Sequence, residues 1–347
     1  MAYTTIDNPL DYFNIVLYTG NTNAQSITGV GFQPDWVWIK KRSSLANHHL
    51  YDSVRGVQKR INSNTTNTEA TATTNLTAFG SDGFTIGTDN DINENNETYA
   101  SWNWKAGTSF TNDASSTGIG TIDSTGSASD TAGFSIVSYT GTGSAGTVKH
   151  GLSSAPSIVL IKNRSASGKS WIMAHKSIGF GNALFLNLTD GSTSEGSAFN
   201  STAPTSSVFT VGNTSLVNDS GNTYIAYCFS EKKSYSKFGS YTGNGNADGT
   251  FVYTGFKPAL TIIKNSGGTG PWYLFDNKRP GFNVINVEIT ANSNDAEATD
   301  ISLDHLSNGF KLRKTGSGVN GSGNSYIYMA FAEQPFVTSS GVPAAAR

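Results

Sequence analysis

The sequence is almost free of cysteine: Cys228 is the single one among 347 residues. One cysteine excludes an intrachain disulfide framework. Because Cys228 lies within an alternating apolar segment, residues 224–229, we expect a small buried side chain there rather than a reactive thiol. A chain without disulfides can assemble in a reducing cytoplasm.

Charge is also scarce. Charged residues make up 14% of the chain and the net charge is −2, whereas an average soluble domain has roughly 25% charged residues. Binding of nucleic acid by counterion release needs a basic face, so we expect no nucleic-acid partner. Serine, threonine, asparagine and 38 glycines take the place of charge. Such a neutral, hydroxyl-rich surface is common in extracellular and virion-borne β proteins.

Long apolar runs are missing as well. No stretch approaches the ~18 apolar residues of a membrane-spanning helix, so membrane insertion is not expected. The first residues lack the basic segment and apolar core of a classical signal peptide. A protein of this kind that works outside a cell is expected to leave the cell by lysis, as part of a virus particle.

What the chain does contain is one sequence pattern that occurs three times. Each copy opens with Tyr-Thr-Gly, continues to a proline and an apolar run that ends in lysine, and closes on an aromatic segment. The opening tyrosines, Tyr18, Tyr139 and Tyr241, lie 121 and 102 residues apart. This period exceeds the about 20–50 residues of a solenoid or propeller unit and matches an autonomous domain of about 100–150 residues. The spacing predicts three tandem domains.

Secondary structure is predicted to be β nearly throughout. Short β-branched and aromatic segments alternate with glycine- and asparagine-rich turns, at roughly six to nine strands per hundred residues. This density predicts an all-β fold of three tandem antiparallel β-sandwich domains, jelly-roll or lectin-like. The predicted boundaries are residues 1–107, 132–233 and 234–333 for the sandwiches, 108–131 for a Ser/Thr/Gly-rich linker or arm, and 334–347 for an extended C-terminal tail.

No residue pattern indicates catalysis. The five histidines lie outside His-Glu-x-x-His and Cys-x-x-Cys contexts, and no phosphate-cradling loop or nucleophile elbow is present. A glycosidase needs two carboxylates, yet acidic positions change between copies: Asp35 becomes Ser157 and Ala259. We therefore predict a non-enzymatic protein without catalytic residues, cofactor or metal. One diverged copy could still carry its own acids, so a glycan depolymerase is the alternative.

Two further patterns each allow two interpretations. Residues 89–94 begin like a calcium-binding loop, but the sixth-position glycine and the twelfth-position glutamate are missing. They indicate either an incidental polar hairpin or a bound calcium ion. A lysine recurs at the end of each apolar run, at Lys40, Lys162 and Lys264. These lysines indicate either a solvated rim or a contact with an anion or a glycan.

Six segments carry a resemblance to a known family: MAYTTIDNP at 1–9, QPDWVWIK at 33–40, YDSVRG at 51–56, SDGF at 81–84, AGFSIVSYTG at 132–141 and FVT at 336–338. Together they resemble a family of marine tailed-bacteriophage structural proteins, over essentially the whole chain. Members are often labelled virion or tail-fibre-like. The resemblance implies a place in the virus particle and brings no catalytic residues with it.

The resemblance implies a non-enzymatic structural protein on the surface of a tailed bacteriophage particle, as a tail fibre, receptor-binding adhesin or capsid decoration. The alternative is a tailspike-like depolymerase that cleaves host surface polysaccharide. Expected partners are other virion proteins of the tail or capsid, further copies of the chain in a homo-oligomer, and a host cell-surface glycan. The expected location is the virion, assembled in the host bacterial cytoplasm and released by lysis.

Host recognition is expected in loops that differ among the copies, at residues 43–49 and 187–204. The candidate surface-recognition residues in these loops are Ser43, Asn47, His48, His49, Asn187, Thr189 and Asp190.

Overall fold

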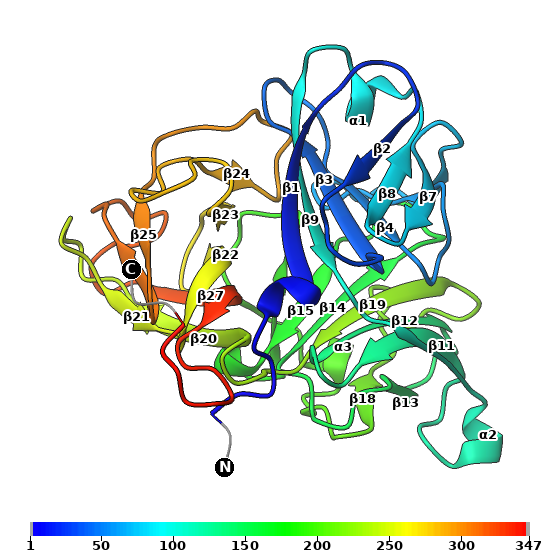
Figure 1. Ribbon diagram of the computed structural model, residues 1–347. Coiled ribbons are helices and arrows are strands. Elements are labelled where there is room, and N and C mark those ends of the chain that lie inside the picture. Colours follow the sequence, from blue (N-terminus) through cyan, green and yellow to red (C-terminus); the bar gives the residue numbers. More distant parts are fainter. Residues whose placement is uncertain (1–2, 345–347) are drawn as a thin grey trace.

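The structure, a computed structural model, describes residues 3–344. Its regular structure is predominantly antiparallel β, which confirms the prediction of an all-β fold. Residues 1–2 of the first family-like segment and residues 345–347 of the predicted tail lie outside the described part. Figure 1 shows three lobes, coloured blue to cyan, green, and yellow to red, grouped around a common centre. They correspond to copy 1 (residues 3–107), copy 2 (108–233) and copy 3 (234–335).

Copy 1 contains a four-stranded and a three-stranded sheet. The first has the order β1 (Phe13–Thr19), β9 (Thr98–Trp104), β3 (Trp36–Lys41), β4 (His49–Asp52), and the second β2 (Gln25–Thr28), β8 (Gly83–Ile86), β7 (Leu76–Gly80). An apolar cluster between them includes Val37, Tyr51, Phe84 and Tyr99. The short elements are η1 (Pro9–Asp11), β5 (Lys59–Arg60), β6 (Ala70–Thr71) and α1 (Asn90–Asn93).

Copy 2 has an eight-stranded sheet and a two-stranded one. The large sheet has the order β10 (Thr108–Asn112), β11 (Ser124–Ser129), β12 (Phe134–Thr140), β19 (Thr223–Phe229), β14 (Ile158–Asn163), β15 (Ile172–His175), β16 (Asn182–Phe185), β17 (Thr193–Ser194). The small sheet pairs β13 (Gly146–Lys149) with β18 (Val208–Val211). Three short helices, α2 (Ala114–Thr117), η2 (Lys176–Ile178) and α3 (Gly196–Phe199), complete this copy.

Copy 3 repeats the arrangement of copy 1. Its five-stranded sheet has the order β20 (Ser236–Thr242), β27 (Ser325–Pro335), β22 (Phe256–Asn265), β23 (Trp272–Asp276), β24 (Ile289–Thr290), and its three-stranded sheet the order β21 (Phe251–Tyr253), β26 (Gly309–Leu312), β25 (Leu303–Leu306). An apolar cluster again fills the space between the two sheets.

Two predicted segments differ from expectation. Residues 108–131 are not a linker, because β10 and β11 extend the sheet of copy 2 by pairing with β12. The predicted tail is not extended either. It begins inside β27 and then turns back, with Val337 bridging Pro343. The backbone N–H of Ser339 donates to the Asp7 carboxylate at 2.6 Å, which ties this hairpin to the N-terminal segment.

The repeated Tyr-Thr-Gly builds the same corner in each copy. The tyrosine ring stacks on the first tyrosine of the closing strand, with centroids 4.9, 5.1 and 5.0 Å apart in the three copies. Its hydroxyl donates to a backbone carbonyl, that of Ile92, Val217 or Val319. The glycine is required because a Cβ would lie 2.1–2.3 Å from a carbonyl oxygen in each copy. Such overlap cannot be relieved by a side-chain movement.

A buried asparagine fixes the neighbouring loop in every copy. Asn93, Asn218 and Asn320 are fully buried. The Asn218 amide, for example, donates to the Ser144 and Gly212 carbonyls at 2.6 and 2.8 Å. Buried polar groups are stable only when they are hydrogen-bonded, and these side chains meet that condition in the same way three times.

The apolar runs are continuous because both faces of their strands are buried. In β3, Trp36 and Trp38 face a central cluster, whereas Val37 and Ile39 face the cluster inside copy 1. The central cluster draws residues from all three copies. Its rings touch across the copies: Trp36 stacks on Tyr227 with centroids 4.4 Å apart, and Phe13 on Phe331 at 5.3 Å. The copies therefore share one aromatic core.

Equivalent contacts close the copies into a ring. The Trp171 Nε1–H donates to the Asn62 carbonyl of copy 1 at 2.8 Å, and the Trp272 Nε1–H to the Phe185 carbonyl of copy 2 at 2.9 Å. In copy 1 the same position is His48, whose Nε2 lies 3.1 Å from the Thr290 carbonyl oxygen of copy 3. Each copy thus has one ring nitrogen that contacts a backbone carbonyl of the preceding copy, and copy 3 is the one that precedes copy 1 in the ring.

The recurring lysines also take part in these contacts. Lys40, Lys162 and Lys264 are 0% exposed, so the prediction of a solvated rim is wrong. Each ammonium group donates to a carbonyl of its own copy and to one of the preceding copy, at Asn294, Thr66 and Thr189. Burial lowers the pKa of each of the three to about 8. Contact with an external anion or glycan would require these groups to leave the interface.

Buried ion clusters occupy two of the three interfaces. Between copies 1 and 2, Glu69 accepts from Arg55 at 3.3 Å and from Arg164 at 2.9 Å. Arg55 also pairs with the buried carboxylate of Asp52, which accepts from the Tyr227 hydroxyl at 2.7 Å.

Copies 3 and 1 repeat this arrangement. Glu297 accepts from Arg279 at 3.1 Å and from Arg42 at 2.9 Å. Asp276 accepts from Arg279 at 2.6 Å and from the Trp102 indole at 3.1 Å.

The interface between copies 2 and 3 has none of these carboxylates and arginines at the equivalent positions. His175 stands where Asp52 and Asp276 stand, since each pairs with the first residue of the apolar run. Ser192 and Ser266 replace the glutamate and the arginine, and they are joined by the Ser192 N–H to the Ser266 carbonyl at 2.9 Å. Because all members of the cluster are absent together, none of them is left as an unpaired buried charge, which would be strongly destabilising.

Candidate functional site

Three of the predicted recognition residues are not on the surface. His48, His49 and Asn187 are buried. Trp38 donates its indole N–H to His48 Nδ1 at 2.8 Å, so the proton of the neutral ring is on Nε2, which faces Thr290. Burial, reinforced by Lys40, holds the pKa of His48 well below its usual value. Asn187 accepts the Trp171 backbone N–H at 2.8 Å. His48 thus contacts copy 3, whereas the hydrogen bond of Asn187 lies within copy 2.

The remaining four predicted residues lie in two different places. Ser43 bonds to the Glu97 carboxylate, and Asn47 accepts from the Asn64 amide at 2.7 Å. Thr189 and Asp190 are exposed at the junction of copies 2 and 3, where the Thr189 carbonyl accepts from Lys264. Residues 43–49 instead adjoin copy 3 through the Ala46 N–H, which donates to the Asn294 carbonyl. The structure therefore does not bring the two loops into one site.

Several acids that could serve chemistry have structural partners. Asp35 accepts from the Ser53 hydroxyl and the Ala106 N–H, both at 2.8 Å. Glu288 accepts from two backbone N–H groups, and burial raises the pKa of its carboxyl. These carboxylates orient loops and strand ends.

The calcium-like segment forms a helical turn rather than a hairpin. Asp89 caps α1 by accepting the Asp91 N–H at 2.9 Å. The Asp91 carboxylate lies 3.5 Å from the Arg60 guanidinium and 3.6 Å from His49 Nε2. Within residues 3–344, no group of three or more His, Cys, Asp or Glu side chains is arranged to hold a metal ion.

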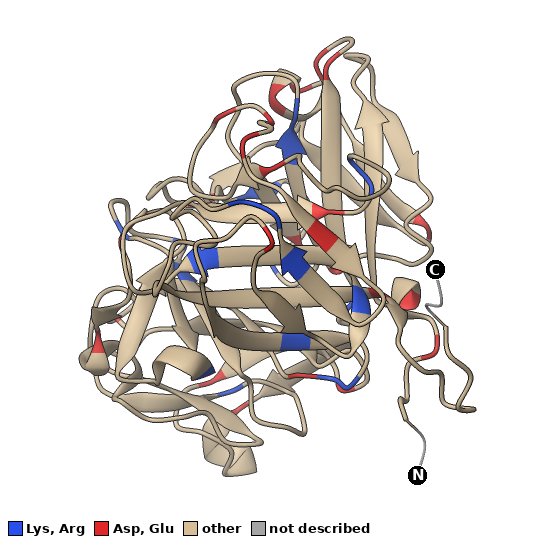
Figure 2. Ribbon diagram, turned by 90° about the vertical axis from the view of Figure 1, so that its left-hand side faces the viewer, with Lys and Arg blue, Asp and Glu red and all other residues tan. Residues whose placement is uncertain are grey.

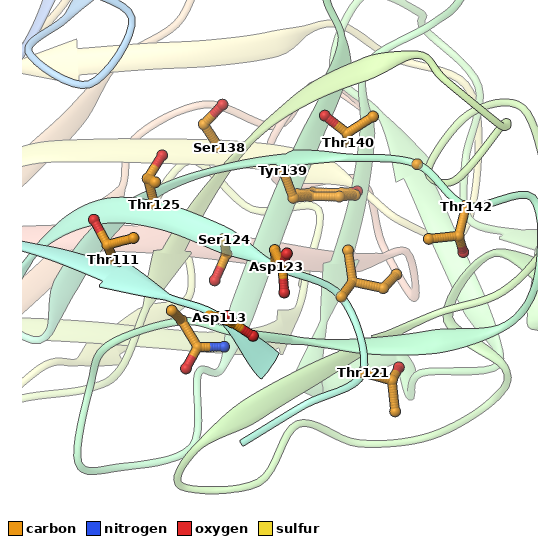
Figure 3. Close-up of a pocket in the computed structure, with 13 residues that line it drawn as sticks. Thr111, Asp113, Thr121, Asp123, Ser124, Thr125, Ser138, Tyr139, Thr140 and Thr142 are labelled. Carbon is orange, nitrogen blue, oxygen red and sulfur yellow. The ribbon is translucent and has the colours of Figure 1, made fainter. Parts of the chain in front are cut away.

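An open groove lies instead between the end of β12 and the part of copy 2 that has no counterpart in the other copies. β10, the α2 loop, β11 and the end of β12 form its walls (Figure 3). The loop is held by its own side chains. Asp113 caps α2 by accepting the Ser116 N–H at 3.1 Å, Asp123 accepts the Ala114 N–H at 2.8 Å, and Gly118 ends the helix with φ +66°.

The groove has a volume of about 570 Å³, and most of the residues that line it carry a hydroxyl group. The exposed lining residues are Thr111, Asp113, Thr121, Asp123, Thr125, Thr140 and Thr142, and the buried ones include Ile122, Ser124 and Tyr139. The Ser115 hydroxyl and the Ser116 N–H hold the pKa of the Asp113 carboxyl below its usual value. No lysine, arginine or histidine is among the lining residues. Such a surface suits a neutral, polyhydroxylated ligand better than an anion.

Sequence reasoning missed this groove because it treated residues 108–131 as a connection. One signal was present: copies 2 and 3 adjoin closely, whereas about twenty-four extra residues precede the opening strand of copy 2. Figure 2 shows the charged residues scattered over strands and loops in that view. Among the described residues, no helix is long and apolar enough to span a membrane.

Fold and groove together define an all-β protein built from three related units closed into a ring, with one added hydroxyl-lined groove. The chain belongs to a family described as a domain of unknown function (DUF7483), whose profile matches residues 8–335 as one unit and so spans all three copies. No curated protein and no solved structure matches the chain.

Proposed function

We propose that the protein is a non-enzymatic structural protein on the surface of a tailed bacteriophage particle, where it acts as an adhesin for a host cell-surface glycan. Its body consists of three antiparallel β-sandwich units, lectin-like or jelly-roll in type, which correspond to copies 1, 2 and 3. The groove of copy 2 is the glycan-binding surface. The resemblance to marine tailed-bacteriophage structural proteins motivates the location in the particle.

The observation that carries the proposal is that the polar residues at equivalent positions of the copies join the copies to one another, whereas the insertion of copy 2 leaves its polar groups exposed. Interface acids, histidines and lysines are buried in contacts between copies, such as Asp52 with Tyr227 and His48 with Thr290. The insertion at residues 108–131 makes no repeated contact and exposes hydroxyl and carboxylate groups around a groove. A saccharide presents many hydroxyl groups, and convergent polar groups on a rigid scaffold supply the orientation and specificity that such a ligand needs.

Binding is tested with a glycan microarray and the purified full-length protein. Thr140→Arg fills the groove with a long charged side chain and is expected to weaken binding roughly tenfold or more. Thr19→Arg is the matched control, because Thr19 is the equivalent, exposed residue of copy 1, where no insertion is present. Equal binding by both variants would contradict the assignment of the groove.

Location is tested with antibodies against the protein on intact particles of the phage that encodes it. Immunogold labelling of the tail supports an adhesin, and labelling over the head supports a decoration protein. Labelling only after the particles are disrupted would contradict a surface location. Release of reducing ends from host polysaccharide by the purified protein would contradict a non-enzymatic role and favour the depolymerase alternative.

A further inference from the structure

The free edges of the large sheets differ between the copies. β1 and β20 end their sheets, whereas the equivalent strand of copy 2, β12, is covered by β11 and β10. The edge of the copy 2 sheet is therefore β10. An edge strand presents unpaired N–H and C=O groups that can pair with another chain unless they are protected.

Side chains protect the edges of copies 1 and 3. The outward backbone N–H of Ile15 in β1 donates to the Asn14 side-chain oxygen at 2.8 Å, and that of Phe238 in β20 donates to the Glu231 carboxylate at 2.8 Å. At the far ends, the Thr19 carbonyl accepts from the Gln25 amide and the Thr242 carbonyl accepts from the Thr250 hydroxyl. Both edges are thus closed at equivalent positions.

The edge of β10 is open. The strand register places the backbone groups of Thr108, Phe110 and Asn112 toward β11, so those of Ser109 and Thr111 point outward. Ser109 and Thr111 are both exposed. Throughout residues 3–344, no loop or side chain bonds to these outward groups. The strand also lacks the lysine or proline with which edges are commonly blocked.

We propose that β10 pairs with β10 of a second copy of the chain, antiparallel and about a two-fold axis through Phe110. Ser109 then lies opposite Thr111 of the second copy, and the two residues exchange backbone hydrogen bonds. The eight-stranded sheet continues without interruption into the sheet of the second molecule. Such an isologous contact closes on itself and gives a dimer rather than a filament.

Charge at the two ends of β10 supports self-pairing. Lys105 and Lys149 lie beside its first residues, and the Lys149 ammonium is 5.7 Å from the Phe110 ring centre. Asp130 is also there, so two lysines and one aspartate give this end a net formal charge of +1. Asp113 and Asp123 lie at the other end. An antiparallel two-fold contact brings the lysine end of each molecule beside the aspartate end of the other, so the contact is electrostatically complementary.

Sedimentation velocity of the full chain over a concentration series tests the proposal. We expect a dimer, with twice the monomer mass of 36.7 kDa. Ser109→Pro removes only an outward N–H and leaves the pairing with β11 intact, so it is expected to weaken the dimer roughly ten- to a hundredfold. Ser240→Pro in β20 makes the same change at an edge that the proposal leaves unpaired, and it is expected to leave the dimer unchanged.

Two charge variants test the register without relying on proline. Ser109→Lys with Thr111→Lys places like charges opposite each other and should give monomers. Ser109→Lys with Thr111→Glu places opposite charges face to face and should keep the dimer. A monomeric wild-type protein, an assembly larger than a dimer, or equal behaviour of the two double variants would overturn the proposal. Circular dichroism confirms that each variant is folded.

Discussion

His48 shows how a residue can differ between copies for structural reasons. Copies 2 and 3 place a tryptophan at this position, Trp171 and Trp272, beside a smaller residue, Leu160 or Ile262. Copy 1 has the reverse, a histidine beside Trp38. The tryptophan therefore lies on the apolar run in copy 1 and at the His48-equivalent position in copies 2 and 3, while the hydrogen bond to the preceding copy is kept in all three. The difference in residue type among the copies at this position therefore reflects side-chain packing and does not indicate a recognition site.

Buried histidines make the protein sensitive to acid. Burial lowers the pKa of His49 and His305 to about 3 and that of His150 and His175 to about 4. In the unfolded chain each titrates near 6.5, so the unfolded state binds more protons as the pH falls below that value. The contribution of these four histidines to the free energy of unfolding is therefore expected to be independent of pH above about pH 6.5. Below that pH it is expected to decrease, down to about pH 4 for His150 and His175 and about pH 3 for His49 and His305.

Denaturant unfolding at a series of pH values measures this decrease. The double variant Trp38→Leu with His48→Trp carries the copy 2 arrangement into copy 1, and it should stay folded with a shallower loss of stability in acid. Loss of stability that is equal in both proteins would contradict the role given to His48.

The glycine of Tyr-Thr-Gly gives a second test at this scale. In Gly141→Ala the new Cβ would lie 2.2 Å from the Asp219 carbonyl oxygen, and we expect a destabilisation of about 1–3 kcal/mol or more. Gly267→Ala is the control, because its nearest neighbour would be 3.6 Å away. Thermal melts of both variants measure the difference, and equal melting temperatures would contradict this explanation of the repeated glycine.

At the scale of elements, strands β10 and β11 could not be predicted because of their amino-acid composition. Residues 124–129 are serine, threonine, glycine and alanine, which carry little of the β-branched and aromatic signal of a strand. Small residues are needed there because Phe110 of β10 packs over Gly126, where a Cβ would lie 2.7 Å from the ring. The repeated strands were predictable from their apolar runs, but this hairpin was not.

Gly126→Ala is therefore expected to loosen the β10–β11 hairpin. A Cβ at this position would also lie 2.3 Å from the Ile136 carbonyl oxygen, within the pairing with β12. Hydrogen exchange should show faster exchange of amides in residues 108–131, with little change in the sheets of copies 1 and 3. Unchanged protection of the hairpin would contradict the close packing of Phe110 on Gly126.

At the scale of the whole molecule, the sequence predicted the three copies but not their ring. Strand-forming residues repeat and are recognisable. The lysines repeat at every interface as well, but their sequence pattern does not show that they are buried, and the acids and arginines change from one interface to the next. Asp52, His175 and Asp276 occupy one position, and only the structure shows that each faces a neighbouring copy. The groove was hidden for a similar reason, because it forms only where the unrepeated residues 111–125 lie against the end of the repeated strand β12.

Interface ion clusters give a prediction at this scale. Asp52→Asn removes the carboxylate that pairs with buried Arg55, and the uncompensated charge is expected to cost about 3–5 kcal/mol. His175→Asn introduces the same residue at the equivalent position of the interface between copies 2 and 3, which lacks the carboxylate–arginine cluster, and it should cost clearly less. Chemical denaturation of both variants measures the difference, and equal losses would contradict the assignment of the charge cluster to the joint between copies 1 and 2.

The shared aromatic core is the central claim, and differential scanning calorimetry of the full chain tests it most directly. Because Trp36, Tyr227, Phe13 and Phe331 join all three copies in one cluster, the account predicts a single cooperative transition with equal calorimetric and van't Hoff enthalpies. Three separable transitions, one for each copy, would contradict it.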